Sequence, residues 1–124
     1  NSESETPLLI ASYKGFSKIV EILVDRGSNI LHQDKDGWTA FHNAAAKGHL
    51  KILQLLLAKN FPIDKRSFTG KTALMLAASK GNIEVIKFLL ENFANPCLQD
   101  TYGEFPYEMC AGLPCLMACE MILE

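Results

Sequence analysis

Hydrophobic and polar positions recur along the chain in a fixed register. Residues 6–20 (TPLLIASYKGFSKIV), 39–53 (TAFHNAAAKGHLKIL) and 72–86 (TALMLAASKGNIEVI) align without gaps, each 33 positions after the one before. In each unit a Thr precedes a short Ala-rich apolar segment, as an N-cap precedes a helix, and a Gly follows where such a helix would end. An internal repeat of this period is typical of folds built by stacking identical units.

A second and more strongly apolar segment follows each of these glycines. Its apolar residues fall at i, i+1, i+3, i+4 and i+5, a stripe wide enough to predict a helix buried over most of its circumference. Turn-forming residues and the glycines Gly37, Gly70 and Gly103 then predict a tight hairpin-like loop. The predicted helix pairs cover residues 7–13 and 17–25, 40–46 and 50–58, 73–79 and 83–91, and 106–111 and 115–123.

These motifs resemble the ankyrin repeat family. The family's Thr-Pro-Leu-His signature corresponds to TPLL at 6–9, TAFH at 39–42 and TALM at 72–75, and its helix pair corresponds to AAAKGHLKILQLLL at 44–57 and AASKGNIEVIKFLL at 77–90. The hairpin motif corresponds to DKDGWT at 34–39. The resemblance implies an all-α solenoid of helix–turn–helix units joined by hairpin loops. Because one unit cannot bury its own apolar face, the units are expected to stack.

The repeats are expected at 6–38, 39–71 and 72–104, after a polar tail at 1–5. Residues 105–124 depart from the pattern, because Phe105, Glu108 and Pro114 stand where the family has Thr, His and Gly. We therefore expect a degenerate or capping fourth repeat there. Its Met117 and Met121 would be poorly solvated, which favours a longer parent protein that covers them.

The bulk composition narrows the class of protein. With 124 residues, 48% hydrophobic and 21% charged, the chain has the composition of an ordinary globular domain. A formal charge of −2 argues against nucleic-acid binding, and no apolar run is long enough to enter a membrane. The polar start NSESETP has no initiator Met and no signal-peptide pattern, so we expect a fragment of a larger intracellular protein, cytoplasmic or nuclear.

The cysteines, histidines and turn aspartates carry no recognisable chemistry. Cys115 and Cys119 would share a helix face, but no second pair at zinc spacing accompanies them, so we expect Cys97, Cys110, Cys115 and Cys119 to be free, buried thiols. His42 and His49 occupy positions that the family uses structurally, and His32 is uninformative. Asp34, Asp36 and Asp100 fit turns better than a calcium loop. No metal, no cofactor and no enzyme activity is expected.

The resemblance implies that partners bind the hairpin tips and the exposed side of the first helices. The corresponding tip residues are Lys35, Asp36 and Trp38, then Phe68, Thr69 and Lys71, then Thr101, Tyr102 and Glu104. The corresponding positions of the first helices are Tyr13, Lys14, Ala46, Lys47, Ser79 and Lys80.

Two features of this set go beyond the family pattern. Exposed aromatic residues have the composition of a binding hot spot, although each could instead cover the base of its own hairpin; they are Tyr13, Trp38, Phe68 and Tyr102. Lys14, Lys47 and Lys80 share one column, so stacked helices would space them about 8–10 Å apart. The alternative is three solvated lysines at a tolerant position.

Asn43 replaces the apolar residue found at Ile10 and Leu76 in the other units. A polar group there must face the groove or find a buried partner, and we favour the groove.

The sequence thus predicts a protein-interaction module whose partner is a protein or peptide segment combining apolar and acidic residues. The alternative is a structural repeat segment that packs against other domains of its parent protein. Recognition of nucleic acid or phosphoinositide through the lysines is a third hypothesis, which the net charge disfavours.

Overall fold

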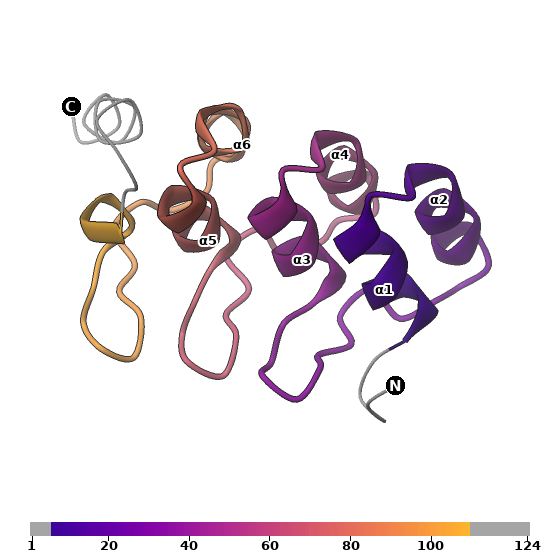
Figure 1. The fold of residues 1–124 in the computed structure, drawn as a ribbon, viewed down its shortest axis with the longest axis horizontal. Coiled ribbons are helices and arrows are strands. Elements are labelled where there is room, and N and C mark those ends of the chain that lie inside the picture. The colour runs from indigo at the N-terminus through magenta and orange to yellow at the C-terminus, as the bar shows by residue number, and fades with distance from the viewer. Residues whose placement is uncertain (1–5, 110–124) are drawn as a thin grey trace.

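The computed structural model describes residues 6–109, which form a single row of helix pairs (Figure 1). The pairs are α1 (Pro7–Lys14) with α2 (Ser17–Asp25), α3 (Ala40–Lys47) with α4 (Leu50–Ala58), and α5 (Ala73–Lys80) with α6 (Ile83–Glu91), followed by the short 3-10 helix η1 (Pro106–Met109). No strand occurs between residues 6 and 109. The predicted all-α fold is confirmed, and the six predicted α-helices end within one residue of the observed ones.

The fourth predicted pair is only partly described. Where a helix over 106–111 was predicted, residues 106–109 form a 3-10 turn instead. The predicted helix at 115–123 lies outside the described residues, as do Met117 and Met121.

The helix boundaries follow from two capping residues in each unit. The side chains of Thr6, Thr39 and Thr72 accept hydrogen bonds from backbone N–H groups in the first turns of α1, α3 and α5. Each of these helices ends at a glycine in the left-handed region, with φ of 84° at Gly15 and 80° at Gly48. Because a side chain at such a φ is strained, the repeated Thr and Gly fix both ends of each first helix.

The helices form two layers, with the hairpin loops extending to one side (Figure 1). The first helices pack in sequence, α1 on α3, α3 on α5 and α5 on η1, while α2 packs on α4. Their contact surface is made of small side chains, and Ala44, Ala45, Ala77 and Ala78 are fully buried. A Cβ atom at Gly15 would lie 2.6 Å from the His49 ring, so a larger residue there would have to displace this ring of the neighbouring unit.

The expectation that the second helices are buried over most of their circumference was wrong. In α2 only Val20 is buried, whereas Ile19 and Ile22 are 47% and 53% exposed. Ile52, in the same column of the repeat as Ile19, is fully buried. The difference arises because α4 lies against α2, while no described element lies on the other flank of α2.

Neighbouring hairpins are joined by backbone hydrogen bonds. The N–H of Phe68 donates to the carbonyl of Asp36 at 3.1 Å, and the N–H of Thr101 donates to that of Thr69 at 3.0 Å. A Cβ atom at Gly37 would lie 2.4 Å from the Phe68 nitrogen, so this approach requires glycine. The tips therefore form a connected row rather than independent loops.

The expectation of buried thiols was wrong for Cys97, which is a free and exposed cysteine. It lies in the loop between α6 and η1. Cys110, Cys115 and Cys119 lie outside the described residues. Between residues 6 and 109 no group of three or more His, Cys, Asp or Glu side chains is arranged to hold a metal ion.

None of the helices in the described part of the chain is long and apolar enough to cross a membrane.

Candidate binding surface

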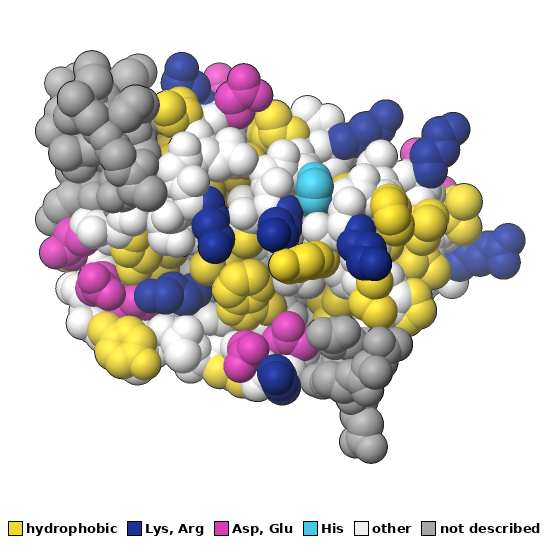
Figure 2. Space-filling view, viewed as in Figure 1, with side chains coloured by type: hydrophobic (Ala, Val, Ile, Leu, Met, Phe, Trp, Pro, Cys, Tyr) yellow, Lys and Arg dark blue, Asp and Glu magenta, His cyan; other side chains and the backbone are white. Residues whose placement is uncertain are grey.

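The candidate surface is the inner face, which we define as the exposed side of α1, α3 and α5 together with the hairpin tips at 35–38, 68–71 and 101–104. Figure 2 looks onto this face. Lys and Arg side chains cross its middle in a row, hydrophobic side chains lie beside that row, and acidic side chains lie towards the tips.

The aromatic residues differ in how far they project from the inner face. Tyr13, Phe68 and Tyr102 are exposed over 49%, 65% and 73% of their surface. Trp38 was expected to be exposed as well but is half-buried, with its ring centroid 6.2 Å from that of His42. Part of the indole thus covers the base of its own hairpin, and the remainder faces the groove.

Lys14, Lys47 and Lys80 are exposed and each lies in the last turn of a first helix. A cation is favoured there by the partial negative charge at the helix C-terminus, so the recurrence of lysine in this column also has a structural explanation that needs no partner. The ammonium of Lys47 lies 4.6 Å from the centre of the Tyr13 ring, so at least one lysine already contacts an aromatic side chain of the neighbouring unit.

Lys71 was expected to face a partner, but its ammonium is held within the molecule. It forms an ion pair and hydrogen bond with the Asp100 carboxylate, and it lies 5.8 Å from the centre of the Tyr102 ring. Burial opposes ionisation of Asp100, yet hydrogen bonds from Lys71 and from the N–H groups of Glu104 and Tyr102 outweigh it and keep the Asp100 pKa below its usual value. Lys71 therefore links two hairpins.

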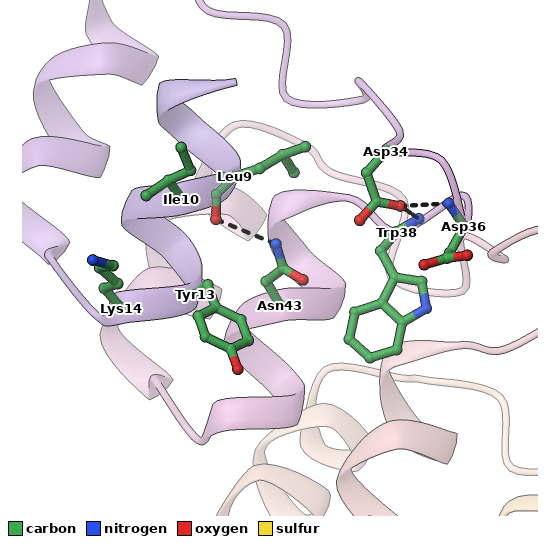
Figure 3. Close-up of a pocket in the computed structure, with 8 residues that line it drawn as sticks. All are labelled: Leu9, Ile10, Tyr13, Lys14, Asp34, Asp36, Trp38 and Asn43. Atoms are coloured by element: carbon green, nitrogen blue, oxygen red, sulfur yellow. Dashed lines mark hydrogen bonds between the residues drawn. The ribbon is translucent and has the colours of Figure 1, made fainter. Parts of the chain in front are cut away.

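Asn43 has a buried hydrogen-bond partner and also faces the groove, which are the two roles that the sequence presented as alternatives. Its amide nitrogen donates to the Leu9 carbonyl at 3.2 Å, and the residue is only 8% exposed, so it does have a buried partner. It also lines a pocket on the inner face. The amide joins α1 to α3 through one end and leaves its oxygen towards the groove (Figure 3).

That pocket, of about 490 Å³, lies between α1, α3 and the first hairpin (Figure 3). It is lined by Leu9, Ile10, Tyr13, Lys14, Asp34, Asp36, Trp38 and Asn43. Five of these residues belong to the predicted site, whereas Leu9, Ile10 and Asp34 do not. Asp34 was expected to form a turn, and it does, because its Oδ1 accepts hydrogen bonds from the N–H groups of Asp36 and Trp38.

The remaining expected site residues lie on or beside the inner face. Ala46 is half-buried, and the others are exposed: Lys35, Asp36, Thr69, Ser79, Thr101 and Glu104. The Thr69 hydroxyl lies 3.3 Å from that of Ser67, and the Glu104 N–H donates to Asp100.

His42 has a structural position. Its Nδ1 accepts from the Thr39 N–H at 3.1 Å and its Nε2 lies 2.9 Å from the Lys71 carbonyl, an arrangement that fixes the proton on Nε2. Burial lowers the His42 pKa, and the hydrogen bond to Lys71 only partly offsets this effect. A neutral, buried imidazole with both nitrogens bonded joins the helix start to the second hairpin.

The fold and this surface define a class of protein, a stack of helix–turn–helix units linked by hairpins. The family described as "Ankyrin repeats (3 copies)" matches residues 8–100, and the chain belongs to the ankyrin repeat family. Ankyrin repeats are generally protein–protein interaction modules, and the family is typically non-enzymatic.

A curated relative shares part of this sequence. The chain is 49% identical over 41 residues to "Glycerophosphocholine phosphodiesterase gde1" of Schizosaccharomyces pombe (strain 972 / ATCC 24843). The match covers 33% of this chain and 4% of that protein, so the similarity concerns a short stretch of a much longer polypeptide.

Proposed function

We propose that this chain binds a protein or peptide partner along the inner face. The observation that carries the proposal is the pocket of about 490 Å³ between α1, α3 and the first hairpin, because it is walled by the aromatic residues Tyr13 and Trp38. Aromatic side chains around a hollow supply large contact areas at low entropic cost, which is why they dominate binding hot spots.

The lysine column suggests what else the partner carries. Lys14, Lys47 and Lys80 present three cations along one line of the inner face, next to exposed aromatic residues. A segment that alternates apolar and acidic side chains would match this arrangement. Because the lysines are exposed, they would contribute mainly to the association rate and to its salt dependence.

The inner face can be tested without knowing the partner. A photo-crosslinking amino acid is placed in the full-length protein at Ser79 on α5, or at Gln54 on α4 as the matched control, since both side chains are exposed. We expect crosslinked partner species from position 79 and not from position 54. Equal or stronger crosslinking from position 54 would place the partner on the outer helices and contradict the proposal.

A second function is favoured by a separate observation, the apolar surface at the α1–α2 end of the row. Phe16, Ile19, Ile22 and Leu31 are 50%, 47%, 53% and 46% exposed, and Figure 2 shows hydrophobic side chains gathered at that end. Such a surface suits packing against another part of the same polypeptide. A crosslinker at Ile22 would then yield an intrachain product, whereas an interchain product would argue for an external partner.

A further inference from the structure

Three of the side chains that line the pocket bring acceptor oxygens to it: Asn43, Asp34 and Asp36. The Asn43 amide nitrogen donates to the Leu9 carbonyl, and the Asn43 side-chain oxygen is directed between Tyr13 and Trp38 (Figure 3). Asp34 uses Oδ1 to hold its turn, while neither its Oδ2 nor the Asp36 carboxylate is bonded by any residue between 6 and 109. Lys14 is the cation that lines the pocket, and it lies on the far side of Tyr13 from Trp38.

The third hairpin contains the same aspartate turn with a cation bound to it. Asp100 stands two units of 33 residues after Asp34. Its Oδ1 accepts from the N–H groups of Tyr102 and Glu104, as the Asp34 Oδ1 accepts from those of Asp36 and Trp38. The Oδ2 of Asp100 binds the ammonium of Lys71, which also lies 5.8 Å from the centre of the Tyr102 ring. This fold thus already places a basic side chain against a hairpin aspartate and an aromatic ring.

We infer that the pocket receives an arginine or lysine side chain of the partner. The cationic head contacts the Asn43 oxygen and the carboxylates of Asp34 and Asp36, and the apolar stem lies between Tyr13 and Trp38. Carboxylates bind such a head by charge-assisted hydrogen bonds, and the indole adds a cation–π contact. This inference rests on the proposed function, which it refines: the partner carries one basic anchor for the pocket and acidic residues for Lys14, Lys47 and Lys80.

Occupancy of the pocket can be read directly, because Trp38 is the only tryptophan of the chain. Peptides without tryptophan are selected from a random display library on the 124-residue chain. Those that no longer bind a Ser79→Arg variant on α5, or an Ala46→Arg variant on α3 beside the pocket, are kept as inner-face binders. We expect these peptides to carry an Arg or Lys whose replacement by Gln lowers affinity roughly 3- to 30-fold, and whose binding changes the Trp38 fluorescence.

The pocket side is tested by Asp36→Asn, with Glu84→Gln on α6 as a control of equal charge change. Asp36→Asn is expected to weaken binding of the basic peptide roughly 3- to 30-fold and to leave binding of the Gln-substituted peptide unaffected. Measuring both proteins with both peptides forms a double-mutant cycle, which isolates the coupling between Asp36 and the basic side chain. Glu84→Gln should change the affinity of neither peptide. Asn43→Leu, which introduces the residue that this column holds at Leu76, should also weaken only the basic peptide.

The outcomes separate the two proposals. Inner-face binders that lack a basic anchor, or that bind without affecting Trp38, overturn the inference and leave the proposed function standing. Peptides that are all insensitive to both Ser79→Arg and Ala46→Arg bind away from the inner face and overturn both proposals. Equal losses for the basic and the Gln-substituted peptide on Asp36→Asn would overturn the inference as well, because Asp36 would then shape the hairpin without contacting a cation.

Discussion

Replacing His42 by methionine tests whether a buried neutral imidazole holds the second unit together. The chain shows what such a variant retains at the equivalent position of the third unit, where the N–H of Thr72 donates to the Met75 sulfur at 3.4 Å. In His42→Met the new thioether sulfur can therefore still accept from the Thr39 N–H. What the variant loses is the 2.9 Å hydrogen bond from His42 Nε2 to the Lys71 carbonyl.

The expected cost depends on pH in a defined direction. Loss of one buried hydrogen bond should lower the free energy of unfolding by about 1–3 kcal/mol at pH 8. The folded-state pKa of His42 lies below its unfolded value of 6.5, so the unfolded wild type binds the proton first as pH falls. The wild type then loses about 1.4 kcal/mol for each pH unit between its unfolded and folded pKa values, whereas residue 42 of the variant does not titrate.

Urea denaturation of both proteins at intervals between pH 8 and pH 5 measures this difference. Subtracting the two curves cancels the groups that the proteins share, so the remainder reports residue 42. The stability gap should be largest at pH 8 and should shrink below pH 6.5. A gap that stays constant across this range would refute the view that His42 is neutral in the folded protein because it is buried.

Three further predictions concern packing, backbone strain and the link between hairpins. Leu56→Ala should lower the free energy of unfolding by about 2–5 kcal/mol, because Leu56 is fully buried. Leu57→Ala, at a partly exposed neighbour, should lower it less, and thermal or urea unfolding measures both. Phe93→Gly should raise stability by about 0.5–1 kcal/mol in the same assay, because Phe93 is 89% exposed at a φ of 70° where Gly27 stands in the first unit. Asp100→Asn should destabilise the protein at pH 7. The difference in stability from the wild type should shrink as the pH falls from about 4 through the lower folded-state pKa of Asp100, because the wild-type carboxylate then becomes protonated. A difference that does not shrink would argue against the ion pair with Lys71.

The helices could be predicted from sequence because their determinants are local. The Thr cap, the Ala-rich segment and the terminal glycine each act within one turn, so the predicted bounds of α3 and α5 agree with the structure to within one residue. The register of 33 residues then carried the same prediction from unit to unit.

The details of the inner face depend on contacts between units, which a column of residues does not reveal. The Lys71 ammonium binds the Asp100 carboxylate, 29 positions away in the sequence, and so is not free for a partner. Asn43 is tied to Leu9 across α1 and α3. The exposure of Ile19 likewise depends on what stands beside α2, because the same column is fully buried at Ile52.

The place of Asp34 in the pocket wall was missed for a related reason, whereas Asp36 belongs to the predicted site. Asp34 has a sufficient local role in its turn, and nothing in the sequence tells which of its two oxygens remains available. The comparison of Asp34 with Asp100 could have raised the question, since the two units share that residue while Ser67 stands between them.

The claim that the inner face is the binding surface is tested most directly by Trp38→Ala, with binding and thermal unfolding measured on the same sample. The ligand is a partner identified by crosslinking from position 79, and Phe93→Ala, which removes an exposed aromatic at the end of α6, is the control. We predict that Trp38→Ala weakens binding by about 2 kcal/mol or more while the protein remains folded, and that Phe93→Ala leaves binding unchanged. Normal binding by a Trp38→Ala protein that unfolds at a lower temperature would show that the indole serves its own hairpin, and would contradict the central claim.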